Sequence, residues 1–87
     1  MTETKTEVRP LRTIAAEIAK NWEPANYAAE PYLQAMGALD TIDDMYCCDT
    51  ASSVVAYFLA NAGTWRGEVA RRVKKELNTM LKSHRGR

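Results

Sequence analysis

The side chains best suited to chemistry are acids and thiols in the middle of the chain. Asp40, Asp43 and Asp44 stand close together, and Asp49 follows them. Carboxylates can hold a divalent cation, but this segment lacks the alternating D-x-D-x-D-G order of a calcium loop and its later bidentate Glu. We therefore interpret these acids as helix caps and as partners of basic side chains, since acids concentrate near helix N-termini.

Cys47 and Cys48 are adjacent, which argues against a disulfide between them. Neighbouring Cα atoms lie about 3.8 Å apart across a trans peptide, below the usual disulfide range. A zinc site is also unfavourable, because there is no second cysteine pair and the only histidine is His84. We expect two reduced cysteines and no metal or other cofactor. The alternative is an intermolecular disulfide or a redox switch.

Nothing in the residue pattern points to catalysis. The chain has no glycine-rich phosphate loop, and its single histidine cannot serve as an oriented base for a nucleophile. We therefore predict that the protein is not an enzyme.

Charge is sorted along the chain. Residues 21–65 hold six acids and no Lys or Arg, whereas residues 66–87 hold eight bases and two acids, so the net charge of +1 hides two opposed regions. Three interpretations stay open. The bases could be neutralised along their own helix through Glu68–Arg72 and Arg72–Glu76, pair with the acidic second helix, or form a docking surface for an acidic protein or a phosphate backbone.

Length and composition indicate one small domain. The chain has 87 residues, of which 46% are hydrophobic and 26% charged, and this is typical of a folded globular protein. We predict a single helical domain over residues 9–82, a flexible segment over residues 1–8 and a basic flexible tail over residues 83–87. Because so small a core is marginal, a dimer is an open alternative.

Two further patterns concern location. Residues 1–8 lack the apolar stretch of a secretory signal, and the longest apolar run, residues 54–60, is too short to span a bilayer. We expect a cytoplasmic protein that does not bind membranes.

Helical periodicity dominates the chain and predicts an all-α fold, a compact bundle of four to five helices around a buried central third helix. The first helix runs from Pro10 to Trp22, with one apolar face. The second begins at Pro31. Gly37 within it is expected to pack closely against another helix. Whether residues 31–46 form one helix or two, the second capped by Asp40, stays open.

The third and fourth helices have clearer limits. Asp49 is the expected N-cap of the third helix and Gly63 its C-terminal glycine, and residues 50–65 carry no charge. A helix that is apolar most of the way round is expected to be buried. Thr64 is the expected cap of the fourth helix, which runs from Trp65 to about Lys82. Its inward stripe consists of Trp65, Val69, Val73, Leu77 and Leu81.

The basic fourth helix supplies the candidate binding residues. The turn around Gly63 resembles a helix-turn-helix, although Leu59 and Arg72 do not suit that motif. Trp65 and Arg66 belong to types that dominate protein interfaces, but Trp65 could instead anchor the last helix on the core. The candidate partner-binding residues are Trp65, Arg66, Arg71, Arg72, Lys75, Asn78 and Lys82.

A pattern-level resemblance covers about residues 12–82. The segments Asn26-Tyr-Ala-Ala, Pro31-Tyr-Leu-x-Ala-Met36, Tyr57-Phe-Leu-x-Asn61-Ala and Thr64-Trp-Arg-Gly-Glu68 make the chain similar to small uncharacterised helical proteins of bacteriophages and mobile elements of Gram-positive bacteria. The resemblance carries over no site residue and implies a protein that binds and modulates a host protein or nucleic-acid machine.

The function expected from the sequence is therefore a small, non-enzymatic helical interaction module that binds a protein partner or a second copy of itself. The alternative is a DNA-binding protein like the helix-turn-helix family, which would use the basic last helix.

Overall fold

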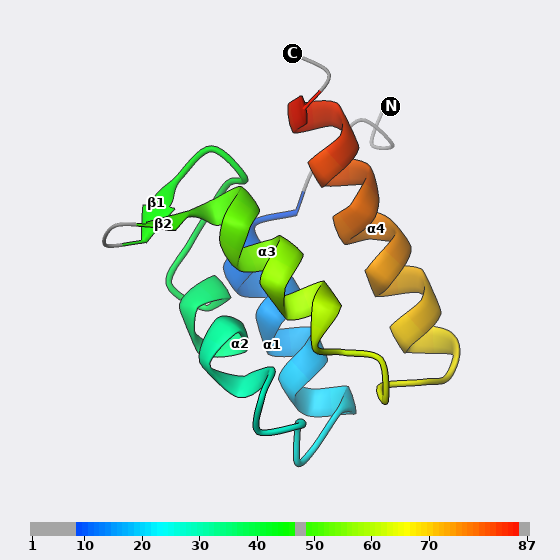
Figure 1. Cartoon of the computed structure of the whole chain (residues 1–87). Coiled ribbons are helices and arrows are strands. Elements are labelled where there is room, and N and C mark those ends of the chain that lie inside the picture. Colours follow the sequence, from blue (N-terminus) through cyan, green and yellow to red (C-terminus); the bar gives the residue numbers. More distant parts are fainter. Residues whose placement is uncertain (1–8, 47–48, 86–87) are drawn as a thin grey trace.

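Four helices and one short pair of strands make up the described part of the chain, residues 9–46 and 49–85 of a computed structural model. The helices are α1 (Leu11–Asn21), α2 (Glu30–Met36), α3 (Ala51–Ala60) and α4 (Glu68–Arg85). Strands β1 (Met45–Tyr46) and β2 (Asp49–Thr50) pair antiparallel just before α3. Helices α1 and α3 each pack against both α2 and α4 (Figure 1). The predicted compact, all-helical fold is thereby confirmed.

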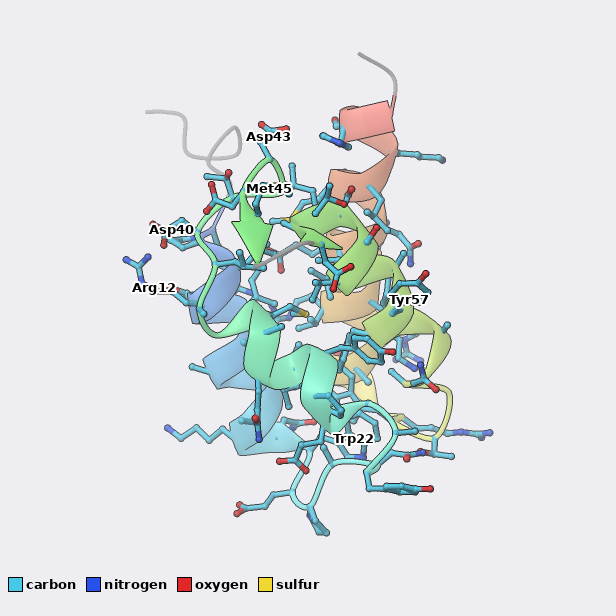
Figure 2. All side chains as sticks on the ribbon, turned by 60° about the vertical axis from the view of Figure 1, so that its left-hand side comes forward. Arg12, Trp22, Asp40, Asp43, Met45 and Tyr57 are labelled. Atoms are coloured by element: carbon cyan, nitrogen blue, oxygen red, sulfur yellow. The ribbon has the colours of Figure 1, made fainter. Side chains whose placement is uncertain are left out.

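The start of α1 is fixed by a loop that follows α2. Leu11 and Arg12 donate their backbone N–H groups to the carbonyls of Asp40 and Leu39, at 2.8 and 2.9 Å, and the next two amides donate to the carbonyl of Pro10. The first four amides of a helix have no partner within it, so these acceptors complete α1 at its N-terminus. The carboxylate of Asp40 also pairs with the Arg12 guanidinium, and the two side chains lie side by side in Figure 2.

Residues 31–46 form neither of the expected arrangements. The helix ends at Met36, and Gly37 is an exposed C-cap rather than a point of close helix packing. A turn follows instead of a second helix. In it the Asp44 carboxylate accepts hydrogen bonds from the backbone N–H groups of Asp40 and Thr41. Side-chain bonds of this kind compete with helix formation, which explains why residues 37–44 form a turn instead of continuing as helix.

The limits of α3 differ from those predicted. Thr50 is its N-cap, because its Oγ1 accepts from the backbone N–H of Ser53 at 3.1 Å, whereas Asp49 lies in strand β2. The helix ends at Ala60 with Asn61 as its C-cap, so Gly63 does not have the predicted role. Thr50 satisfies an amide that the helix itself leaves free.

The last helix begins three residues later than predicted. Trp65 precedes it, Thr64 is not its cap, and Gly67 has φ 109°, a conformation that glycine adopts readily. At its other end α4 continues through residue 85, beyond the expected end at Lys82 and into the predicted tail. Residues 1–8, 86 and 87, together with Cys47 and Cys48, lie outside the described residues.

The core is formed by one face of every helix. Helix α3 buries Val54, Val55 and Phe58 as predicted, but its opposite face is exposed, with Tyr57 54% accessible. It is therefore buried on one side only, not all round. In α4, Val73 and Leu77 are fully buried. None of the helices in the described residues is long and apolar enough to cross a membrane.

Candidate interaction surface

Trp65 belongs to the core. It is 2% exposed, its ring stacks on that of Trp22 at a centroid distance of 5.6 Å, and its Nε1–H donates to Asn21 Oδ1 at 2.8 Å. Phe58 contacts both indole rings edge-on. A side chain so enclosed cannot present itself to a partner. The structure corrects its assignment as a binding residue and agrees with the alternative, an anchor for the last helix.

Arg72 also has a structural partner. It pairs with Glu17 of α1, which lies 2.9 Å from Arg9, and Arg9 makes a bidentate bond to Glu76 of α4 at 2.7 and 3.0 Å. The predicted pairs within α4, Glu68–Arg72 and Arg72–Glu76, are therefore replaced by pairs that join α4 to α1 and to the residue before Pro10. The hydrogen bond from Arg72 is the main cause that lowers the pKa of Glu17. The hydrogen bond to Glu76 raises the pKa of Arg9.

Four of the remaining candidates are unpaired bases. Arg66, Arg71, Lys75 and Lys82 are exposed, and none of them has an ion-pair partner among the residues that the structure describes. Arg71, Lys75, Asn78 and Lys82 are spaced i, i+4, i+7 and i+11, so they share one side of α4. This side is available to an acidic ligand.

Pairing between the acidic segment and the basic helix is limited. Asp43 Oδ1 lies 2.9 Å from His84 Nδ1, whereas Asp40 pairs with Arg12 of α1. Figure 2 shows Asp43 at the end of the molecule opposite Trp22. Among the described side chains, Arg71, Lys75 and Lys82 of α4 have no ion-pair partner in the acidic segment, so the second of the three interpretations is wrong for these three bases.

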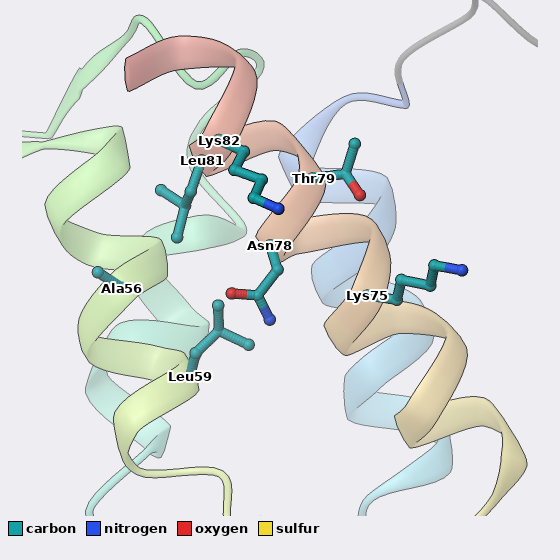
Figure 3. A pocket seen from close by; sticks show the side chains of 7 residues that line it. All are labelled: Ala56, Leu59, Lys75, Asn78, Thr79, Leu81 and Lys82. Carbon is teal, nitrogen blue, oxygen red and sulfur yellow. The ribbon is translucent and has the colours of Figure 1, made fainter. Parts of the chain in front are cut away.

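A groove lies between α3 and α4 beside these bases. Its volume is about 510 Å³, and it is lined by Ala56, Leu59, Lys75, Asn78, Thr79, Leu81 and Lys82. In Figure 3, Leu59 of α3 and both Asn78 and Leu81 of α4 lie in the space between the two helices, whereas Lys75 extends on the side of α4 away from α3. The groove therefore has an apolar floor and a basic edge.

Three candidate residues, Lys75, Asn78 and Lys82, line this groove, with the Lys75 side chain extending on the side of α4 away from α3. Arg66 and Arg71 line a smaller hollow of about 260 Å³ at the start of α4, together with Lys74, whose Nζ donates to the Trp65 carbonyl. The predicted set thus divides into a groove, a second basic hollow and two residues with structural roles.

Sequence reasoning missed the apolar floor. Ala56, Leu59 and Leu81 had all been assigned to buried stripes or to a buried central helix, but Ala56 is exposed and both leucines are only partly buried. The useful signal was present in α4, where Leu81 adjoins Lys82 and Asn78 lies one turn away. A leucine at the edge of a core stripe, next to unpaired bases, marks the boundary between core and surface.

The connection between α3 and α4 bears on the alternative function. It comprises residues 61–67, whereas a helix-turn-helix joins its helices by about three to four residues. The longer connection, with Trp65 buried inside it, weakens the likeness to that motif.

Neither the described side chains nor the known proteins assign a metal or a family to this surface. Within the described residues, no group of three or more His, Cys, Asp or Glu side chains is placed to hold a metal ion. The chain matches no protein-family model, and neither the curated proteins nor the solved structures contain a match to it. The resemblance to small phage proteins stays a prediction.

Proposed function

We propose that the protein is a non-enzymatic interaction module that binds and modulates a protein partner through the groove between α3 and α4. The observation that carries this proposal is the juxtaposition of an apolar floor, at Leu59 and Leu81, with the unpaired bases Lys75 and Lys82. Apolar surface gives a partner something to bury, and unpaired charge at the edge steers and orients it.

A protein ligand suits this groove better than a nucleic acid does. Phosphate backbones are recognised mainly through charge, and an apolar floor adds little to that recognition. The interior of a protein interface, in contrast, is depleted of charge and rich in apolar contacts. A DNA duplex is the second candidate, because Arg66 and Arg71 extend the basic side of α4 beyond the groove.

The test is affinity capture of partners from lysate of the producing cells, with and without nuclease. The probe variant is Ala56→Arg, which fills the groove from an exposed helical position. Its matched control is Ala16→Arg, at an exposed position in the interior of α1. Both variants replace alanine with arginine, and both residue types have high helix propensity, so neither change is expected to perturb folding.

We expect a protein that is captured despite nuclease, is retained by Ala16→Arg and is lost with Ala56→Arg. Capture that depends on nucleic acid would favour the second candidate, as would duplex binding that weakens steeply with salt. Equal capture by both variants would show that the groove is not the binding surface.

A further inference from the structure

We propose that the partner segment held in this groove is an amphipathic α-helix with acidic side chains beside its apolar stripe. This inference rests on the proposed function and specifies the ligand of the same groove. Its two supports are the shape of the groove and the arrangement of unpaired charge around it.

The shape favours a helix. The groove lies between two helices, and its α4 wall extends from Lys75 to Lys82, or about 10 Å at 1.5 Å per residue. This length corresponds to two turns of a helix packed alongside. A helix lying in such a groove places residues i, i+3 or i+4, and i+7 against the floor. Leu59 and Leu81 offer those residues apolar contact from both walls.

The charge favours an acidic ligand. Lys75 and Lys82 are seven residues apart, so their positions lie on the same side of α4 two turns apart, although the Lys75 side chain extends away from α3. Acids at i and i+7 of a bound helix would have the same spacing. Arg71 continues the row by one further turn, and it also lacks an ion-pair partner within the described residues. A basic helix would instead meet like charge along the whole edge, which is unfavourable.

A second copy of the chain fits the groove poorly. Helices α1 and α2 bury their own apolar stripes, which include Ile14, Ile18, Leu33 and Met36. The acid of α1, Glu17, already pairs with Arg72 and Arg9. Neither of these helices therefore offers the required combination of a free apolar stripe and free acids, and we assign the groove to a different protein.

The experiment is selection from a displayed library of randomised helical peptides, using the whole protein as bait. Enriched peptides are then synthesised, and their affinities are measured for the wild type and for Lys82→Glu. The matched control is Lys20→Glu, which reverses an exposed lysine in the last turn of α1. Circular dichroism of each variant establishes that it is folded, and Lys75→Glu replaces Lys82→Glu if the latter is not.

We expect enriched peptides to carry apolar residues at i, i+3 or i+4, and i+7, with acids two turns apart. Lys82→Glu should weaken their binding about tenfold or more, which corresponds to the loss of one good charge contact. Lys20→Glu should change the affinity by no more than about twofold, since Lys20 lies on α1 outside the groove and makes no contact with a ligand bound there.

Several results would overturn the inference. These are enrichment of basic or non-helical peptides, equal weakening by both lysine variants, and no enrichment at all. A dimer of the wild type, seen by sedimentation and broken by Lys82→Glu, would identify a second copy as the occupant. If Ala56→Arg abolishes capture of a cellular protein while selected peptides lack acids, the proposed function stands and only this inference fails.

Discussion

Three aromatic side chains link segments that are distant in sequence. The Trp22 and Trp65 rings are nearly parallel, with an interplanar angle of 12°, and Phe58 contacts both edge-on. They join the end of α1, the interior of α3 and the connection that precedes α4. Edge-to-face and offset-stacked aromatic pairs add to the stability gained from burial alone. This cluster therefore ties the end of α1 and the connection before α4 to α3.

Truncation of Phe58 tests the importance of this cluster. Phe58 is fully buried, so Phe58→Ala should lower the free energy of unfolding by about 3–5 kcal/mol through lost burial and the cavity that remains. Its sequence neighbour supplies the control. Tyr57 is largely exposed and contacts only the Tyr32 ring among described aromatic residues, so Tyr57→Ala should cost about 1 kcal/mol. Urea unfolding measures both, and equal losses would contradict the assignment of Phe58 to the core.

Glu17 gives the stability a dependence on pH. Its pKa is lowered from the ordinary value of 4.5, chiefly by the hydrogen bond from Arg72. A carboxyl whose pKa is lower in the folded state stabilises the protein above its unfolded pKa, and this contribution is lost as the pH falls through the folded value. We therefore expect Glu17→Gln to be less stable than the wild type at pH 7. Below about pH 4.5 the two melting temperatures should converge.

Thermal unfolding monitored by circular dichroism between pH 7 and pH 3 measures this convergence. Glu23→Gln is the control, because Glu23 is exposed and has no ion-pair partner within the described residues. Its melting curve should follow the wild type at every pH. A constant difference between Glu17→Gln and the wild type would show that the pairs with Arg72 and Arg9 do not stabilise the fold.

Helix limits show how far local signals can be trusted. The apolar spacing from Leu11 to Ile18 and from Val54 to Phe58 predicted buried faces correctly, because burial of one stripe is what stabilises a short helix. The caps were predicted less well, since several neighbouring residues could serve. Asp49 and Thr50 are both suitable N-caps, and pairing of Asp49 with Tyr46 in the strands decides in favour of Thr50.

Replacement of these two residues distinguishes the caps. Thr50→Ala removes the acceptor for the Ser53 amide and should cost about 1 kcal/mol of unfolding free energy. Asp49→Ala should change it by less than about 0.5 kcal/mol, as an exposed substitution with no cap to lose. Chemical unfolding of the two variants provides the measurement. A larger effect from Asp49→Ala than from Thr50→Ala would show that Asp49 is the N-cap of α3, as the sequence predicted.

The bases of the candidate surface could be predicted from the sequence, whereas their partners and the apolar floor of the groove could not. Bases stand out in a sequence, and Lys75, Asn78 and Lys82 were among the predicted partner-binding residues. The partners of Arg72 and Glu76 were not predictable, because they come from α1 and from Arg9, more than fifty residues away. The floor at Leu59 likewise depends on how α3 and α4 pack, which no local pattern determines.

Across the whole molecule, the basic residues fall into two groups, one paired with acids and one unpaired within the described residues. Two bases at the surface between α1 and α4, Arg9 and Arg72, pair with Glu17 of α1 and Glu76 of α4. Bases along the outer side of α4 stay unpaired within the described residues. A small domain gains little stability from exposed charges, so we attribute the unpaired row to the proposed recognition of a ligand.

The most direct test of this account is site-specific photo-crosslinking in the cells that produce the protein. A photoreactive amino acid replaces Ala56 in the groove or, as the control, Ala16 on α1; both are exposed helical positions. The account predicts a discrete crosslinked protein from position 56 that is absent from position 16 and disappears when Lys82→Glu is added. Crosslinks of equal yield from both positions, or crosslinks from position 16 alone, would contradict the claim that the α3–α4 groove is where this protein binds its partner.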